Sequence, residues 1–155
     1  MDTNPLVSII VPIFNGEEYI AGTIESVISQ TYLNWEMILV DNCSTDKTSA
    51  IINRFVASDT RIRKLTLEIN SGGPARPRNK GLSVARGYFV AFIDADDVWD
   101  ANKLSVQVDF IRQSNADLVH CGATIINSAS QRIGNRNSFK KFKYIKLCLG
   151  QSNTL

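Results

Sequence analysis

Apolar residues along this chain follow two spacings, one typical of buried strands and one typical of amphipathic helices. Continuous apolar runs, or apolar residues alternating with polar ones, predict five strands, at residues 6–11, 37–40, 65–69, 88–92 and 118–123. Between them, apolar residues recur three and four positions apart, which predicts helices with an apolar stripe on one face. These stripes are Ile20, Ile24, Val27 and Ile28; Ile51, Ile52, Phe55 and Val56; Leu82 and Ala85; and Leu104, Val108 and Ile111. Strands that alternate with helices predict an α/β fold, with a mostly parallel sheet flanked by helices on both faces.

Several polar and proline residues predict where these elements begin and end. Pro12 cannot donate to a sheet ladder, so we expect it to stop the first strand. Asn15 followed by Glu18 has the spacing of a capping box at the start of the first helix. The Ser-Thr-Asp run at 44–46 offers good caps for the second helix, and Pro77 suits the first turn of the third. The third strand alternates apolar and polar residues, as expected near a sheet edge.

Three carboxylates, those of Asp94, Asp96 and Asp97, directly follow the fourth apolar run, which we expect to be a buried strand. Like charges repel one another, so a stable protein rarely gathers them without a cation or a ligand. They would emerge at the C-terminal end of a strand, where open α/β sheets place their ligands. The cluster therefore indicates a site for a divalent metal and phosphate. A surface turn rich in Asp is the alternative interpretation.

Polar residues also follow the first two predicted strands. Asn15 follows the first strand, and Asp41 and Asn42 follow the second. In a parallel sheet these strand ends lie along one edge, so the residues should converge with the acidic cluster on one crevice. Helices are expected to begin just after them, and helix N-termini offer partial positive charge and free N–H donors suited to phosphate. Asp41 and Asn42 could instead be turn or cap residues.

Composition limits the class of protein. The 155 residues are 44% hydrophobic and 21% charged, which fits one globular domain over residues 1–155. A net charge of +2, with no basic stripe interleaved with aromatics in the first 130 residues, argues against nucleic acid as a partner. Cys43, Cys121 and Cys148 are too few and too far apart for a disulfide framework or a zinc site. No leader is evident and no window reaches the roughly 18 apolar residues of a membrane span, so a cytoplasmic location is expected.

One basic segment leaves two interpretations open. Lys140, Lys141, Lys143 and Lys146 interleave with apolar residues, a pattern that could make peripheral contact with an anionic membrane surface. A solvated helix face beside a core-facing stripe explains the same pattern. His120, the only histidine, lies in a predicted strand and is more typical of a core or edge residue than of a catalytic one.

Four sequence blocks resemble the N-terminal half of family 2 glycosyltransferases. They are VSIIVPIFN at 7–15, VDNCSTD at 40–46, RNKG at 78–81 and DADD at 94–97. The resemblance covers about residues 5–127, and four blocks in the family's order and spacing are far more specific than a lone DxD. It implies the Rossmann-like GT-A fold, a UDP-linked or other nucleotide-sugar donor and a divalent Mg or Mn ion. It also implies transfer with inversion to a saccharide or lipid-linked acceptor in cell-surface polysaccharide synthesis.

The resemblance also assigns roles to residues on the nucleoside side of such a donor. Pro12, Phe14 and Asn15 match the loop beside the nucleobase and ribose. Glu17 either joins that loop or is an ordinary first-turn helix residue. Asp41 and Asn42 match the pair that reads the base. Many members have Asp where this chain has Asn42, and a carboxamide can both accept and donate, which leaves the preferred base open.

Further roles follow on the diphosphate side. By resemblance, Asp94 faces the ribose, Asp96 binds the metal and Asp97 supports them. Arg78 could neutralise donor phosphate or pair with a carboxylate. The expected nucleotide-sugar-binding residues are thus Pro12, Phe14, Asn15, Glu17, Asp41, Asn42, Arg78, Asp94 and Ala95, with Asp96 as the metal ligand.

The catalytic base is expected elsewhere. Inverting transfer needs a general base to deprotonate the acceptor, and in this family it is an Asp or Glu well downstream of the DxD. No acidic residue follows Asp117, so we expect the base beyond Leu155 and interpret the chain as a truncated, donor-binding N-terminal portion of a catalytic domain. Two other functions are alternatives. A non-catalytic sugar-nucleotide-binding module would show the same sequence. A Mg-binding phosphoacceptor receiver domain would need acidic residues after the first strand, where this chain has Pro-Ile-Phe-Asn.

Overall fold

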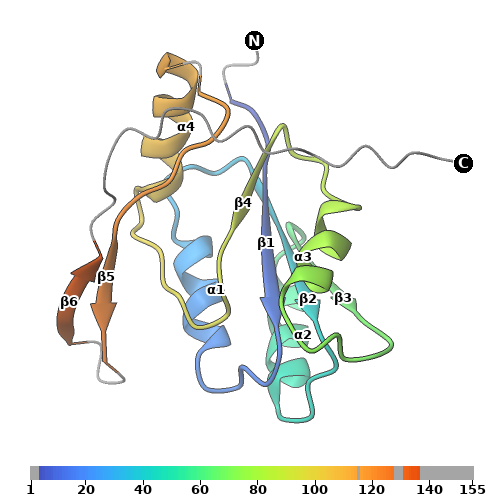
Figure 1. Cartoon of the computed structure of the whole chain (residues 1–155). Coiled ribbons are helices and arrows are strands. Elements are labelled where there is room, and N and C mark those ends of the chain that lie inside the picture. Colours follow the sequence, from blue (N-terminus) through green and yellow to red (C-terminus); the bar gives the residue numbers. More distant parts are fainter. Residues whose placement is uncertain (1–3, 115, 128–130, 137–155) are drawn as a thin grey trace, which may run out of the picture. The chain divides into compact units, whose positions relative to one another are not determined.

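A computed structural model describes residues 4–114, 116–127 and 131–136. The chain divides into two compact units, Met1–Asp109 and Phe110–Leu155, and each is described by itself. The first unit contains a four-stranded parallel sheet of order β3-β2-β1-β4 (Figure 1). Its strands are β1 (Val7–Ile13), β2 (Trp35–Asp41), β3 (Ile62–Thr66) and β4 (Phe89–Phe92), and its helices are α1 (Ile20–Ile28), α2 (Thr48–Ser58) and α3 (Ala75–Leu82). Helix α4 (Lys103–Ser114) begins in this unit.

Both faces of the sheet are covered, because the two central strands, β1 and β2, are buried along their whole length and are mostly apolar. On one face, side chains such as Ile9 and Leu39 join a cluster with buried residues of α1, α2 and the first turns of α4. On the other face, Ile10 and Ile38 belong to a smaller cluster beside α3, where Gly81 lies against Ile10. Continuous apolar runs are typical of parallel strands buried on both sides. The predicted parallel sheet with helices on both faces is therefore confirmed, with β3 at one edge.

β1 continues through Pro12, so the prediction that proline stops this strand is wrong. On the β4 side of β1, the carbonyl groups of Leu6 and Ile10 accept hydrogen bonds from Phe89 and Ile93. Pro12 lies two residues further along on that same side, beyond the last β1–β4 pair. Its missing N–H therefore costs no ladder bond, which is the condition under which proline is tolerated in a strand.

β4 is only half buried, contrary to the expectation of a fully buried strand. It forms an edge of the four-stranded sheet, and its side chains alternate between partly buried and exposed. Phe89 and Ala91 pack against the core, whereas Val90 and Phe92 are 41% and 46% exposed. The apolar run was a correct sign of a strand, but a sequence run does not reveal that the strand lies at an edge.

The second unit contains a two-stranded antiparallel sheet of β5 (Ala123–Ile126) and β6 (Arg132–Arg136). The prediction of a parallel strand at 118–123 is wrong, since residues 118–122 are not in a strand. A parallel pair needs a long crossover, whereas β5 reaches its antiparallel partner through a short connection. The basic segment at 140–146 lies outside the described residues. Among the residues that are described, no helix has the length and apolar character needed to cross a membrane.

Candidate active site

Two adjoining cavities lie at the C-terminal ends of β1, β2 and β4, as the sheet topology predicts. Both are bounded by Pro12, Phe14 and Pro74. The first has a volume of about 260 Å³ and is further lined by Ile13, Asn42, Asn70, Gly72, Gly73 and Pro77. The second, of about 380 Å³, is further lined by Asn15, Gly16, Tyr19, Arg78, Asp94, Ala95 and Asp96. Every residue expected at the site lines one of these cavities except Glu17, Asp41 and the supporting Asp97.

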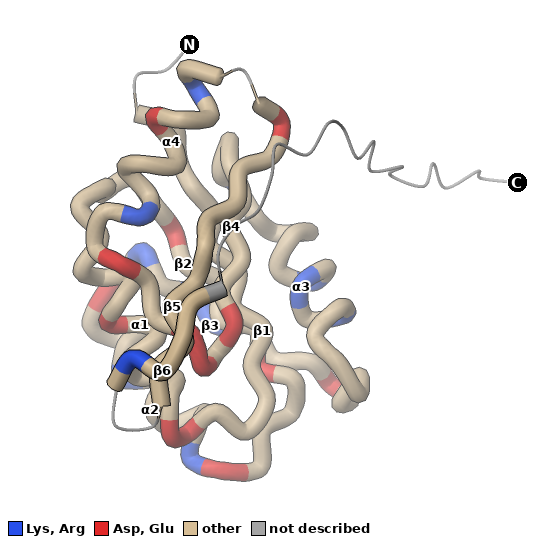
Figure 2. Tube along the Cα trace, turned by 60° about the vertical axis from the view of Figure 1, so that its left-hand side comes forward, with Lys and Arg blue, Asp and Glu red and all other residues tan. Residues whose placement is uncertain are grey.

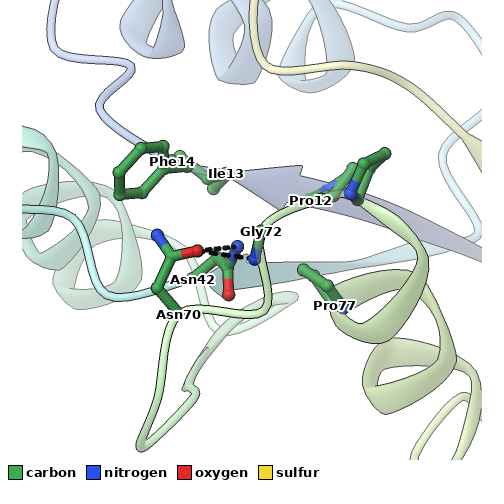
Figure 3. A pocket seen from close by; sticks show the side chains of 9 residues that line it. Pro12, Ile13, Phe14, Asn42, Asn70, Gly72 and Pro77 are labelled. Carbon is green, nitrogen blue, oxygen red and sulfur yellow. Dashed lines mark hydrogen bonds between the residues drawn. The ribbon is translucent and has the colours of Figure 1, made fainter.

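The floor of the first cavity is built around the carboxamide of Asn42, which is only 3% exposed. Its Oδ1 accepts hydrogen bonds from the backbone N–H and the hydroxyl of Ser71, at 3.0 and 3.1 Å. Its Nδ2 donates to Oδ1 of Asn70 at 3.4 Å, and that oxygen also accepts from the N–H of Gly72 at 2.7 Å (Figure 3). Asn42 thus fixes the 70–73 loop as one wall of the cavity. Within the described residues, the bond to Asn70 uses one of the two N–H groups of Asn42 Nδ2.

Asp41 lies behind this cavity and braces the turn that follows β2. Its side chain is buried, with Oδ1 accepting from the N–H of Ser44 at 2.9 Å and Oδ2 lying 3.9 Å from Nζ of Lys64. The bond from Ser44 is the contact expected if Asp41 is a turn residue. Asn15 and Cys43, in the loops after β1 and β2, both have positive φ, 47° and 63°.

The second cavity gathers charge. Arg78 on α3 donates from a guanidinium nitrogen to Oδ1 of Asp94 at 2.5 Å, and both side chains are partly exposed. Helix α3 also carries Arg76 and Lys80, so basic positions recur along it (Figure 2). Asp97 has an exposed side chain. Partial desolvation by the surrounding atoms, and then the negative charges of Asp96 and Asp94, raise the pKa of its carboxyl. Carboxylates crowded in this way favour a cation among them.

The carboxylates fit a metal ion that is shared with a ligand. The described residues contain no group of three or more His, Cys, Asp or Glu side chains that could hold a metal ion by themselves. Mg²⁺ in nucleotide sites is commonly bound by one or two carboxylates together with substrate phosphates, not by an all-protein cage. Asp94 and Asp96 on the wall of the second cavity suit that arrangement.

The helix starts differ from the sequence prediction. Helix α1 begins at Ile20, and its N-cap residue, Tyr19, makes no side-chain capping bond, so the predicted capping box of Asn15 and Glu18 is wrong. Oδ1 of Asn15 instead accepts from the N–H of Thr45 at 2.8 Å. The N-cap residue of α2 is Lys47, one position beyond the caps predicted at 44–46, and it makes no side-chain capping bond. Oδ1 of Asp46 does accept from the N–H of Thr48, the first residue of α2, at 3.0 Å.

The backbone N–H groups of the loop between β1 and α1 are also used within the chain. The N–H groups of Asn15, Gly16 and Glu17 all donate to side chains of the 44–48 segment. These residues lie beyond the end of β1, and Asn15 has a positive φ, so their N–H groups are satisfied by side chains and not by a strand partner. Arg78 is the basic side chain that lines the second cavity.

Sequence reasoning missed several residues that line the cavities. Asn70 and Pro74 belong to the Asn-Ser-Gly-Gly-Pro run after β3, whose turn composition was recognisable, but nothing in that run pointed to a site. Tyr19 was missed because the helix was expected to begin before it. A hydrogen bond with Glu18, then the charge of Glu18, and finally burial and the charge of Asp96 raise the pKa of the Tyr19 phenol.

Curated relatives of this chain are glycosyltransferases by name. It is 43% identical over 122 residues to the putative teichuronic acid biosynthesis glycosyltransferase TuaG of Bacillus subtilis, covering 79% of this chain and 48% of TuaG. It is 42% identical over 142 residues to WfgD of Escherichia coli, a UDP-Glc:alpha-D-GlcNAc-diphosphoundecaprenol beta-1,3-glucosyltransferase, covering 92% of this chain and 54% of WfgD. The chain thus spans about half the length of these relatives.

Solved structures give the same fold. Staphylococcus aureus TarS 1–349 in complex with UDP is 37% identical to this chain, with a TM-score of 0.68 over 72% of this chain and 33% of that one. The mannosyltransferase PcManGT of Pyrobaculum calidifontis, in complex with GDP-Man and Mn²⁺, is 25% identical, with a TM-score of 0.66 over 79% of this chain and 36% of that one. These neighbours confirm the GT-A fold. The profile of glycosyl transferase family 2 matches residues 8–154, and the chain belongs to that family.

Proposed function

We propose that this chain is the donor-binding part, residues 1–155, of a catalytic domain that transfers a sugar from a UDP-linked donor with inversion. The acceptor is a saccharide or a lipid-linked saccharide, and the product belongs to cell-surface polysaccharide synthesis. The observation that carries the proposal is the adjacency of the two cavities: one is lined by Phe14, Asn42 and Asn70, and the other by Arg78, Asp94 and Asp96. A nucleoside diphosphate has the same division into a planar base and a charged end. Family membership removes the receiver-domain alternative.

On the base side, Pro12 and Phe14 supply apolar walls, and Phe14 is 52% exposed and able to cover a base. Asn42 offers its remaining N–H, and Asp41 braces the turn from behind. Asn15 and Glu17 complete this side, with Asn15 in the second cavity and Glu17 in the loop that supports it. UDP in the similar TarS structure supports the choice of nucleotide.

On the diphosphate side, Arg78 has N–H donors beyond the one that it shares with Asp94. A guanidinium carries five N–H groups, and its bond to Asp94 uses one of them. The pairing with Asp94 and a phosphate contact are therefore compatible, and the carboxylate can orient Arg78 for the phosphate. Asp94 and Ala95 lie where the ribose and diphosphate would pass, and Asp96 would hold Mg²⁺ or Mn²⁺. When bound, the ion would neutralise the charge of the departing diphosphate. Mn²⁺ in the PcManGT structure supports this choice of metal.

The acceptor side is proposed to lie outside this chain. The general base that deprotonates the acceptor would come from an Asp or Glu beyond Leu155, since no acidic residue follows Asp117. A lipid-linked acceptor, like the diphosphoundecaprenol named for WfgD, would place the reaction at the inner face of a membrane, with peripheral contact.

The test is calorimetric titration of the chain with UDP in Mn²⁺ and in EDTA. We expect tighter binding in Mn²⁺, because Asp96 and the diphosphate would share the ion. Asp96→Asn should remove the Mn²⁺-dependent increment alone, whereas Asp41→Asn should weaken binding in both buffers. Equal UDP affinity with and without Mn²⁺ would contradict the shared ion, and absence of binding in both would contradict the donor site.

A further inference from the structure

The loops after β1 and β2 are joined by a set of hydrogen bonds in which side chains of each loop accept from the backbone of the other. From the first loop, the N–H groups of Asn15, Gly16 and Glu17 donate to Ser44 Oγ, Thr48 Oγ1 and Asp46 Oδ2 at 3.0, 2.8 and 3.0 Å. From the second, the N–H groups of Thr45 and Lys47 donate to Asn15 Oδ1 and Glu17 Oε2, both at 2.8 Å. These distances are those of well-formed hydrogen bonds.

Within this set, Glu17 and Asp46 form a reciprocal pair. Asp46 Oδ2 accepts from the N–H of Glu17, and Glu17 Oε2 accepts from the N–H of Lys47, the N-cap residue of α2. Asp46 also accepts from the N–H of Thr48 through its other oxygen. Burial would raise the pKa of Asp46, but hydrogen bonds from the side chain and backbone of Thr48 and from the backbone of Glu17 outweigh it and lower that pKa.

Neither carboxylate lines a cavity, whereas other residues of the same two loops do. Phe14, Asn15 and Gly16 precede Glu17 directly and form walls of the second cavity. Asn42 opens the second loop and lines the first cavity. The relative position of these walls is therefore set by bonds that the ligand itself does not touch. A mispositioned wall would reduce the fraction of molecules that can bind, and hence the apparent affinity, in proportion.

We propose that Glu17 and Asp46 are positioning residues that hold the two loops together in the arrangement that binds the nucleotide. This inference rests on the proposed function and changes the role of Glu17 from a donor contact to a support for the loop. Each carboxylate acts as a hydrogen-bond acceptor for a backbone N–H, so its shape matters more than its negative charge.

The test compares UDP affinity in Glu17→Ala, Glu17→Gln and Asp46→Ala by calorimetry in Mn²⁺, at a temperature at which urea titrations show every variant fully folded. Opening the loop pair in about nine molecules of ten would weaken binding about tenfold, the change expected for Glu17→Ala and Asp46→Ala. Glu17→Gln should bind as the original chain does, because its carboxamide oxygen can still accept from Lys47. Glu25→Ala is the matched control, since it removes an exposed carboxylate of α1 that lines neither cavity and belongs to neither half of the pair.

Three outcomes decide between the interpretations. If the double variant Glu17→Ala/Asp46→Ala weakens binding no more than either single variant, the two residues act as one unit, as proposed. If Glu17→Gln loses as much affinity as Glu17→Ala, Glu17 acts through its charge on the donor and the positioning role is wrong. If the single Ala variants bind UDP as tightly as the original chain, the pair is not needed for binding. Failure of the original chain itself to bind UDP would contradict the proposed function instead.

Discussion

At the scale of single residues, Cys43 has an uncommon conformation for its type. Its φ of 63° lies in the left-handed region, where a Cβ atom costs roughly 1–2 kcal/mol relative to glycine. Its thiol compensates in part, because Sγ donates to the carbonyl of Leu67 at 3.0 Å and the side chain packs against the smaller core cluster. The loop thus keeps a strained backbone next to Asn42, which lines the first cavity.

We predict that Cys43→Gly will be more stable than Cys43→Ala by about 1 kcal/mol, because both lose the sulfur and only glycine relieves the strain. The free energy of unfolding in urea measures the difference. Cys43→Ala serves as the control for the lost thiol contacts. Equal stability of the two variants would mean that the left-handed turn is not retained in solution.

Sequence and structure agree best for residues whose role depends on the strand that they follow. Asp94, Asp96 and Asn42 reach the cavities because parallel strands end at one edge, which a sequence pattern reveals. The partner of Glu17 could not be predicted in this way. Its hydrogen bond goes to Lys47, 30 residues away, and it depends on how two loops turn after their strands. The same limit applies to Asn15, whose spacing suited a cap that the structure does not form.

At the scale of elements, helix α3 lies against the sheet at a glycine. A Cβ added to Gly81 would lie 2.5 Å from Cγ2 of Ile10, a buried side chain of β1. Gly22 in α1 is exposed and would meet nothing within 4 Å. The packing of α3 on the sheet therefore depends on Gly81, whereas no packing contact of α1 depends on Gly22.

We predict that Gly81→Ala will destabilise the fold by about 1–3 kcal/mol through overpacking. Gly22→Ala should stabilise it by up to about 1 kcal/mol, since alanine is the better helix former. Urea titrations of the two variants side by side provide the measurement, and each is the control for the other. A gain in stability from Gly81→Ala would show that α3 does not approach β1 so closely.

Four segments are held together by Glu36, which lies in β2 and is 2% exposed. Its carboxylate accepts from the hydroxyl of Ser8 in β1 at 2.7 Å and from the guanidinium of Arg63 in β3 at 2.9 Å. Arg86, just before β4, donates from its backbone at 2.8 Å and from its side chain at 2.7 and 2.9 Å. Burial alone would raise the pKa of Glu36, but the bonds from Ser8 and Arg86 and the charge of Arg63 lower it to about 2.

A carboxyl whose pKa is lowered on folding contributes stability above its unfolded pKa and loses that contribution as the pH falls through its folded pKa. For Glu36 this window runs from the ordinary value of 4.5 down to about 2. The shift corresponds to a contribution on the order of 3 kcal/mol at neutral pH. We predict that Glu36→Gln will be less stable at pH 7 and will lack this part of the acid-induced loss. Urea titrations between about pH 6 and pH 2, a range that includes the interval between the two pKa values, measure this loss of stability. Identical pH slopes for both proteins would assign the acid sensitivity to other groups.

At the scale of the whole molecule, the pattern of apolar residues was enough to predict the parallel sheet and its two helical layers. It could not distinguish an edge strand from a central one, which is why β4 is more exposed than expected. It also misplaced the last strand, because Leu118–Ala123 has the same apolar character as a core strand but lacks a parallel partner among the described residues. Local propensity does not specify which partner a strand finds.

The chemistry of the described carboxylates leads to a prediction about turnover. Asp94 and Asp96 line the second cavity, which we propose holds the diphosphate end of the donor. Carboxylates in that position could not also deprotonate an acceptor on the opposite face of the sugar. Loss of a general base costs about 10²–10⁴-fold in rate, and loss of acceptor positioning adds to that. We therefore expect this chain to bind UDP yet to transfer little or no sugar from a UDP-sugar to an added acceptor.

A longer protein that includes this chain and reaches the length of its relatives should restore transfer, measured by product formation under the same conditions. Substituting its downstream Asp or Glu with Asn or Gln should abolish transfer while leaving UDP affinity unchanged, because that carboxylate would act on the acceptor and not on the nucleotide. The informative result is loss of sugar transfer in a variant whose UDP affinity is unchanged. Efficient transfer by the 155-residue chain alone would mean that the base lies within it. The carboxylates beside the second cavity, with Asp97 first among them, would then be the groups to substitute.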